Sequence, residues 1–342
     1  MKIIILAGGG GTRLWPISKK DFPKQFLHFG GQESLLQKTI QRFASASFAD
    51  EILISTNAAY APLVETQISK LPLSKKCEIL IEPFSKNTAS AIALAVKHID
   101  KTAEDAEILV LPSDHFITPE KKFHACIEKT LPLIRKGKMA AFGIRPHKPE
   151  TGYGYIHMGK ALRENTYAVK KFVEKPDVGK AMDFVMSGEY LWNSGIFAFS
   201  STTFWKELSL HAPEIAEIFN HSLEYALEHF SELPDISIDY ALMEKTKKML
   251  VFSMDVTWSD VGSWDRLYEV LEKDQNQNVK MGNVVDIETK NSLIMGGKKL
   301  ISTIGLDDML IVETEDAIFI AKKGESEKVK RLVELLQLKN KT

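Results

Sequence analysis

The sequence predicts a protein of the α/β class, with a mixed, mostly parallel sheet flanked by helices and a small C-terminal region of short strands. Two observations predict it. In the first half, short β-rich apolar runs alternate with segments whose apolar residues recur at helical spacing. After about Asn278, the apolar runs become shorter and turn residues separate them. The 342 residues leave room for two or three structural units.

The alternation in the first half is typical of βαβ units and favours a Rossmann-like sheet. The expected strands are Ile3–Ala7, Ile52–Ser55, Ile79–Ile81 and Ile108–Leu111, and the expected helices are Ser34–Phe43, Ala61–Ser69 and Thr88–Ile99. Ligands of open α/β sheets bind at the carboxyl ends of the strands. We therefore expect the loops after Leu6, Ile81 and Leu111 to carry the site.

The pattern is mixed in the middle of the chain and strand-rich at its end. The expected strands are Tyr153–His157, Ala168–Val173, Met249–Val256, Asn283–Ile287, Ser292–Met295, Leu310–Glu313 and Ala317–Ala321. The expected helices are Asp177–Met186, Phe204–Glu228, Ile238–Lys247 and Ser326–Leu336. We expect one domain over residues 1–275 and a second over residues 276–342.

Charge and apolar patterning exclude two classes of partner. Lys and Arg total 44 and Asp and Glu total 45, which gives a net charge of -1 and argues against a nucleic-acid-binding protein. No apolar run approaches the ~20 residues that span a bilayer. Cys77 and Cys126 lack the spacing of a metal site. These features favour a cytoplasmic protein that binds neither nucleic acid nor membrane.

The first motif follows the first expected strand and reads Leu6-Ala7-Gly8-Gly9-Gly10-Gly11-Thr12-Arg13, with Lys24 downstream. Glycines let the backbone approach a ligand closely, and their N–H groups can form a concavity that binds anions. Arg13 adds a guanidinium fork for phosphate oxygens, and Lys24 adds a second cation. The loop is not a P-loop, because no Lys-Ser or Lys-Thr follows the glycines. The motif predicts phosphate binding.

Two aspartates are candidate ligands for Mg²⁺, which proteins bind through one or two carboxylates together with substrate phosphates. Asp114 follows the strand that ends at Leu111, next to Ser113 and His115, and Asp260 lies in the segment Trp258–Trp264. His115 is expected to support its neighbours rather than to react. Taken alone, Asp260 is more often a turn residue or a helix cap, and that alternative stays open.

Together these motifs resemble those of nucleotidyltransferases that make sugar nucleotides, and most closely the mannose-1-phosphate guanylyltransferase family, also called GDP-mannose pyrophosphorylases. The supporting segments follow the family's order over about residues 1–270: Leu6–Pro16, Pro23–Gln25, Glu82–Ala89, Leu111–His115, Gly152–Ile156, Phe172–Pro176, Trp192–Phe197, Asp239–Glu244 and Trp258–Trp264. The resemblance implies the nucleotide-diphospho-sugar transferase type of fold, a short β-helix-like C-terminal domain and a homodimer. In the short-strand region after Asn278, we expect sheet edges and apolar side chains such as Ile294, Ile311 and Phe319 to need cover. Longer relatives continue into a phosphomannose isomerase domain, so that activity is not expected here.

The resemblance also implies roles for individual residues. The nucleotide, GTP, would contact Leu6, Ala7, Gly8, Gly9, Gly10, Gly11, Thr12, Arg13, Lys24, Glu82, Pro83, Asn87, Thr88, Ser113 and Asp114. The sugar phosphate would contact Gly154, Glu174, Lys175, Asn193 and Asp260. Asp114 and Asp260 would hold Mg²⁺, and they would act in catalysis with Arg13, Lys24 and Lys175. The pair Lys19-Lys20 departs from the family, in which many members have an arginine after Ser18.

The expected reaction is the Mg²⁺-dependent, in-line transfer of GMP from GTP to mannose 1-phosphate, with release of pyrophosphate. The nearest alternative is a related hexose-1-phosphate nucleotidyltransferase that uses UTP or dTTP. A nicotinamide oxidoreductase is disfavoured because the glycine loop is not a clean dinucleotide fingerprint. A non-catalytic sugar-nucleotide sensor should have lost these charged groups, yet the chain retains Arg13, Lys24, Asp114, Lys175 and Asp260.

Overall fold

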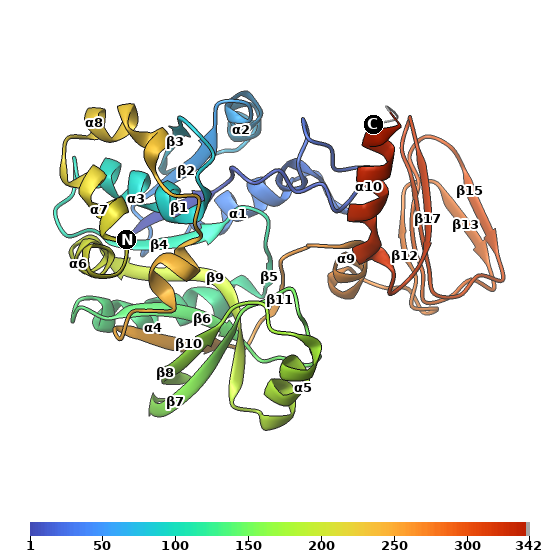
Figure 1. The fold of residues 1–342 in the computed structure, drawn as a ribbon. Coiled ribbons are helices and arrows are strands. Elements are labelled where there is room, and N and C mark those ends of the chain that lie inside the picture. The colour runs from blue at the N-terminus through green and yellow to red at the C-terminus, as the bar shows by residue number, and fades with distance from the viewer. Residues whose placement is uncertain (340–342) are drawn as a thin grey trace. The chain divides into compact units, whose positions relative to one another are not determined.

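The computed structural model describes residues 1–339, and these form two compact units (Figure 1). The first unit comprises Met1–Gly8, Thr39–Ser113 and Ile117–Val256. The second comprises Gly9–Lys38, Asp114–Phe116 and the residues from Thr257 onwards. Most of the glycine loop therefore belongs to the second unit, with the C-terminal strands.

A mixed sheet forms the centre of the first unit. Within residues 1–339, the order of its nine strands is β3 (Lys76–Glu82), β2 (Glu51–Asn57), β1 (Lys2–Leu6), β4 (Glu107–Pro112), β9 (Tyr190–Ser200), β6 (Met139–Ile144), β10 (Met249–Met254), β8 (Thr166–Val173) and β7 (Tyr155–Arg163). The first four strands are parallel, as the βαβ pattern predicted. β9 then runs antiparallel to both β4 and β6. The predicted mixed sheet is confirmed.

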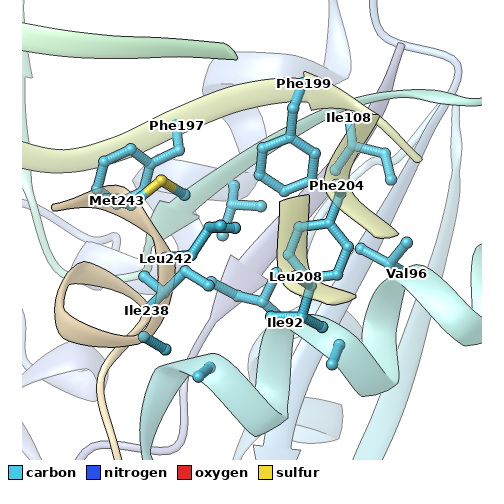
Figure 2. Close-up of a cluster of buried hydrophobic side chains, with 14 of the residues drawn as sticks. Ile92, Val96, Ile108, Phe197, Phe199, Phe204, Leu208, Ile238, Leu242 and Met243 are labelled. Atoms are coloured by element: carbon cyan, nitrogen blue, oxygen red, sulfur yellow. The ribbon is translucent and has the colours of Figure 1, made fainter. Parts of the chain in front are cut away.

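Apolar side chains from strands and helices fill the core of the first unit. The helices around the sheet are α1 (Leu35–Ala44), α2 (Ala61–Ile68), α3 (Asn87–Ile99), α4 (Glu120–Ile134), α5 (Val178–Ser187), α6 (Ser201–His211), α7 (Pro213–Asn220) and α8 (Leu223–Glu228). Figure 2 shows Ile92 and Val96 of α3 beside Phe199 of β9 and Phe204 and Leu208 of α6. This buried core holds the β4 and β9 strands, and with them the loops at their ends.

The structure corrects the predicted helices after residue 200. The single helix expected over Phe204–Glu228 is three helices, α6, α7 and α8, because Pro213 begins α7 and the Ser222 side chain caps α8. The helix expected over Ile238–Lys247 is shorter: it is a π-helical turn, η3 (Asp239–Met243). Helix α4 and strand β9 were not predicted as separate elements.

Short strands stack in the second unit, as the turn-separated runs predicted. β12 (Val279–Met281), β14 (Leu293–Met295) and β16 (Met309–Glu313) pair in parallel, and β17 (Ile318–Lys322) closes the sheet antiparallel to β16. β13 (Val284–Ile287) pairs in parallel with β15 (Ile301–Ile304). Figure 1 shows these strands with helix α10 (Val329–Leu338) at the end of the chain.

The apolar residues expected to need cover in this region, Ile294, Ile311 and Phe319, are instead buried within the chain. They point inward from β14, β16 and β17, so that prediction was wrong. The exposed apolar side chains of these strands and their ends are Val285, Ile287, Leu300, Ile304, Ile318 and Ile320. In the described residues, none of the helices has the length and apolar character to cross a membrane.

Candidate active site

Backbone hydrogen bonds and side chains of neighbouring strands fix the start of the glycine loop. Ser113 N donates to the carbonyl of Leu6 at 3.0 Å, and Ala7 N donates to the carbonyl of Ser55 at 2.8 Å. The amide of Asn57 donates to the carbonyl of Gly8 at 3.3 Å. These bonds lie at the carboxyl ends of β1, β2 and β4, where the sheet topology predicted ligand contacts.

The next residues of the loop are exposed and carry the predicted arginine. Gly9 and Gly10 are exposed, and so is Arg13. The Gln25 side chain donates to the carbonyl of Gly9 at 2.9 Å, and Trp15 N donates to the carbonyl of Thr12 at 3.1 Å. The loop thus presents glycine backbone and a guanidinium to solvent while both of its ends are held.

Lys24 connects the two predicted metal ligands. Its Nζ lies 3.0 Å from Oδ2 of Asp114 and donates to the backbone carbonyl of Asp260 at 2.7 Å. It projects from a short 3₁₀ helix, η1 (Lys24–Phe26), and its side chain is largely covered. Three residues predicted from separate motifs therefore meet around one ammonium group.

The Asp260 carboxylate is held by Arg266, which the sequence analysis missed. Nη1 of Arg266 donates to both carboxylate oxygens of Asp260, at 3.0 and 2.9 Å, and the guanidinium is buried. Gly262 N also donates to Oδ1 of Asp260 at 3.1 Å, so the turn role that stayed open is present as well. A Cβ on Gly262 would lie 2.6 Å from the carboxylate, which explains the glycine there.

The donor chemistry of this cluster fits Mg²⁺. Asp114 and Asp260 offer hard carboxylate oxygens. In residues 1–339, there is no group of three or more His, Cys, Asp or Glu side chains that would bind a metal without a substrate. Mg²⁺ commonly takes one or two carboxylates and completes its coordination with phosphate oxygens and water. His115 is a neighbour whose Nδ1 accepts from the indole N–H of Trp258 at 3.3 Å, in agreement with a supporting role.

Glu82 lies at the end of β3 beside the start of the glycine loop. Its side chain is buried and accepts a hydrogen bond from the Ser55 hydroxyl at 2.8 Å. Burial raises the pKa of this carboxyl, and the Ser55 hydrogen bond offsets part of the shift. A Cβ on Gly8 would lie 3.5 Å from Oε1 of Glu82, so the carboxylate is within reach of a ligand that lies along the loop.

Asn87 and Thr88 both make structural hydrogen bonds at the start of α3. The Asn87 amide donates to Asp235 at 3.1 Å, and the Thr88 hydroxyl accepts from Ile238 N at 2.9 Å. Asn87 is exposed, as is Pro83. The side chains of Asn87 and Thr88 therefore join the start of α3 to residues 235–238. A role in base recognition stays a prediction for these three residues.

The predicted sugar-phosphate residues of the first unit lie together. A side chain on Gly154 would collide with the Glu174 carboxylate and press on Asn193. Lys175 Nζ lies 2.7 Å from Oε1 of Glu174. Burial lowers the pKa of Lys175, but the Glu174 carboxylate, together with Tyr240 and Asp239, more than offsets this, and the net pKa is raised. The Lys175 side chain remains exposed and charged, so it can meet a phosphate.

Asp239 belongs to the same cluster and was named in a motif without a role. Its Oδ1 accepts from the Asn193 amide at 2.8 Å. Asn193 Oδ1 in turn accepts from Gly195 N at 3.1 Å, so the orientation of the amide is fixed. Burial and the nearby Glu174 carboxylate raise the pKa of Asp239 to about 6. The raised pKa of Asp239, next to groups that can bind hydroxyls, marks it as a candidate functional residue. This signal depends on tertiary contacts, so the sequence alone does not reveal it.

The fold and these residues define a nucleotide-handling enzyme, and comparison with protein families agrees. The family model for nucleotidyl transferases matches residues 2–277, and that for the MannoseP isomerase/GMP-like beta-helix domain matches residues 282–336. The chain belongs to the nucleotidyl transferase family and is a nucleotidyltransferase. The predicted family resemblance and the β-helix-like domain are confirmed. The two matches meet between residues 277 and 282.

Individual relatives cover nearly the whole chain. A Sinorhizobium fredii protein named mannose-1-phosphate guanylyltransferase is 39% identical over 97% of this chain and 67% of its own length. The alginate biosynthesis protein AlgA of Pseudomonas putida is 41% identical over 99% of this chain and 72% of its own. A Thermus thermophilus crystal structure, described as a mannose-1-phosphate geranyltransferase, is 29% identical and covers 98% of both chains with a TM-score of 0.89.

Proposed function

We propose that the protein transfers the guanylyl group of GTP to mannose 1-phosphate, which gives GDP-mannose and pyrophosphate. The observation that carries this proposal is the 39% identity, over 97% of this chain, to a relative named mannose-1-phosphate guanylyltransferase. The Lys24–Asp114–Asp260 cluster and the Glu174–Lys175–Asn193 cluster support it, because they offer groups for a triphosphate and for a sugar phosphate.

The proposed reaction is a displacement at the α-phosphorus of GTP. A phosphate oxygen of mannose 1-phosphate forms the new P–O bond, and the bond between the α-phosphorus and the bridging oxygen breaks, so pyrophosphate leaves with the electron pair. Phosphate monoesters are largely ionised near neutral pH, since the second pKa of phosphoesters is about 6. The attacking oxygen therefore needs no general base. No covalent intermediate with the enzyme is formed.

The task of the protein is to hold two anions in line and to neutralise their charge. Lys175 positions the attacking phosphate, while Glu174 and Asn193 bind sugar hydroxyls. Arg13 and Lys24 stabilise the departing pyrophosphate, and the Gly8–Gly11 backbone approaches the phosphates. Mg²⁺ held by Asp114 and Asp260 would polarise phosphate oxygens and neutralise the charge that develops on them.

A pyrophosphate-release assay with a matrix of substrates tests this proposal. It pairs GTP, ATP, UTP, CTP and dTTP with mannose 1-phosphate and glucose 1-phosphate, with and without Mg²⁺. We expect the highest kcat/KM for GTP with mannose 1-phosphate, and turnover only with the divalent ion. A clear preference for UTP or dTTP with glucose 1-phosphate would support the alternative enzyme and reject guanylyl transfer. Absence of turnover with every pair would support the non-catalytic sensor.

We also propose that the protein forms a homodimer through its C-terminal short-strand region. The supporting observation is the set of exposed apolar side chains on β13 and β15, which are Val285, Ile287 and Ile304. Large exposed apolar patches mark interaction sites on soluble proteins.

A further inference from the structure

The glycine loop takes its apolar support from the C-terminal third of the chain. The segment that follows the four glycines shares one buried core with the short strands and α10. From the first segment the core contains Leu14, Leu27, Phe29 and Leu35, and from the C-terminal region it contains Leu293, Leu310, Val312, Phe319 and Val329. A segment that the sequence predicts to bind phosphates is therefore packed on strands from the far end of the chain.

An aromatic cluster, formed by Trp15, Trp264 and Phe319, joins the loop to β17. The Trp15 ring lies edge-on to Phe319, with ring centroids 6.2 Å apart, and Trp264 stacks on Phe319 with centroids 6.5 Å apart. The indole N–H of Trp264 donates to the backbone carbonyl of Trp15 at 3.0 Å. Trp15 lies two residues after Arg13, so the cluster fixes the chain next to the predicted phosphate contact.

The alternation of β17 shows that Phe319 is directed at the loop. Phe319 is 6% exposed, whereas Ile318 and Ile320 on either side of it are 62% and 61% exposed. Successive side chains of a strand point to opposite faces. One face of β17 thus packs on the loop, and the other is open.

The turn between β16 and β17 adds a polar contact to the same loop. Lys19 forms an ion pair with Asp316 of this turn, and both side chains are substantially exposed. An exposed pair contributes little to stability. The pair links this turn to the segment that ends in Lys24.

The C-terminal region also holds the segment that carries Asp260. The Asp265 carboxylate accepts from Gly324 N at 2.7 Å and from Ser326 N at 3.2 Å. Arg266 holds the Asp260 carboxylate through Nη1, and its Nη2 lies 3.7 Å from Oε1 of Glu327. Asp265 and Arg266 both belong to α9 (Trp264–Val270), so this helix is attached to the chain after β17.

We propose that the C-terminal strands position the glycine loop for the nucleotide, with Phe319 and Asp316 as positioning residues that act through Trp15 and Lys19. This inference rests on the proposed binding of GTP by the loop. Glycines lose more conformational freedom on ordering than other residues do. A loop held at Trp15 and Lys19 has lost part of that freedom before the nucleotide arrives, so binding costs less. The strands therefore raise the affinity for GTP without touching it.

Three variants of the full chain test the inference: Phe319→Ala, Asp316→Asn and, as the matched control, Ile320→Ala. Each is assayed for KM with both substrates, for melting temperature and for mass by light scattering. We expect Phe319→Ala to raise the KM for GTP by ~3-fold to ~10-fold, as the loss of an aromatic contact predicts. The KM for mannose 1-phosphate should stay within about twofold. Ile320→Ala should leave the KM for GTP and the KM for mannose 1-phosphate unchanged, because it truncates an apolar side chain on the exposed face of the same strand.

Limited digestion with trypsin provides a readout that needs no activity. Arg13, Lys19 and Lys20 are exposed cleavage positions in the loop. Phe319→Ala and Asp316→Asn should accelerate cleavage there relative to Ile320→Ala, and added GTP should slow it. Wild-type cleavage rates and an unchanged KM for GTP in a folded Phe319→Ala protein would overturn the inference. Failure of the proposed function looks different: the wild-type protein would neither bind nor use GTP, whatever the digestion rates.

Discussion

The ammonium nitrogen of Lys24 lies 3.0 Å from a carboxylate oxygen of Asp114, and both side chains are more than four-fifths covered. A covered charge pair is strongly coupled, because removal of one partner leaves the other without compensation. A substitution of Asp114 is therefore more informative than one of Lys24. It removes a proposed Mg²⁺ ligand and also the partner of Lys24, the cation that would meet the pyrophosphate.

We predict that Asp114→Asn and Asp260→Asn each lower kcat by ~10²-fold or more at saturating Mg²⁺. A bound metal ion contributes several kcal/mol of charge stabilisation, and about 1.4 kcal/mol corresponds to tenfold in rate. The control is Asp255→Asn, whose side chain is 88% exposed and forms an ion pair with the exposed Lys122. Melting temperatures separate loss of activity from loss of fold, since Asp260 also holds the buried Arg266. Near-normal turnover in both variants would reject the metal assignment.

A second prediction separates the two phosphate contacts. Lys175→Ala should raise the KM for mannose 1-phosphate, and Arg13→Ala should raise the KM for GTP, each by ~10-fold or more, because a charge-assisted hydrogen bond is lost. The reason is their different surroundings: Lys175 pairs with Glu174 beside Gly154, whereas Arg13 follows the glycines. Initial rates with each substrate varied in turn check this. Equal effects of each variant on the two KM values would contradict the division.

Base selection should depend on Glu82. Guanine presents N1–H and an exocyclic amine as donors, and a buried carboxylate has acceptor capacity for them beyond its hydrogen bond from Ser55. We expect Glu82→Ala to reduce the preference for GTP over ATP by ~10-fold or more, since an unpaired buried polar group costs roughly 1–3 kcal/mol. Asn87→Ala should have a smaller effect of the same kind. Unchanged selectivity in Glu82→Ala would show that other groups read the base.

The raised pKa of Asp239 makes the stability of the protein depend on pH. Because this pKa is about 6 in the folded state, the native protein favours the protonated carboxyl. The cost of ionising it appears as pH rises from about 4 to 6 and is fully present above 6. The groups facing Asp239 are Glu174, which adds to this cost, and Lys175 and Asn193, which reduce it.

Asp239→Asn should therefore stabilise the protein at pH 7.5 by on the order of 1–3 kcal/mol and have little effect at pH 4. Thermal melts of wild type and variant across this range measure the difference, with Asp255→Asn as the exposed control. The variant should also raise the KM for mannose 1-phosphate, because the Asn193 amide loses its charged acceptor. The idea fails if the difference in melting temperature is the same at pH 4 and pH 7.5.

The proposed homodimer makes a simple prediction. Ile304→Asp should yield a monomer, because it places a charge on a 71% exposed apolar position of the short-strand region. Met186→Asp, at an 81% exposed position of α5, should leave the mass unchanged. Light scattering at several concentrations measures both. A wild-type protein that is monomeric throughout would reject the dimer.

Helices and strands were predictable where the apolar residues recur with a single period, either that of a helix or that of a strand. The apolar runs of β1, β2, β3 and β4 and the helices between them followed from alternation alone. Strand β9 was missed because it is buried on both faces over most of its length, so no alternation marks it. Pro213 and Ser222 mark the breaks in the predicted Phe204–Glu228 helix, although apolar residues recur across them.

The candidate residues were predictable from motifs, but their partners were not. Lys24 and Asp260 are separated by 236 positions, and no local pattern reports such a contact. Arg266 resembled any helical arginine until the structure showed it on the Asp260 carboxylate. Asp239 needed the approach of Asn193 and Glu174 before its raised pKa could be recognised. The candidate role of a residue can be predicted from its type and its motif. The contacts that link one such residue to another can be identified only from the three-dimensional structure.

The second unit combines segments from the beginning and the end of the chain, and this affects how the protein folds during synthesis. Its first segment, Gly9–Lys38, leaves the ribosome early, yet the strands that cover Leu14, Leu27 and Phe29 are synthesised last. During synthesis these apolar side chains lack the C-terminal part of their core until nearly the whole chain has emerged. Contacts of such long sequence separation form slowly and leave apolar surface open to aggregation. Expression yield should therefore respond more to chaperone supply than the stability of the finished protein would suggest.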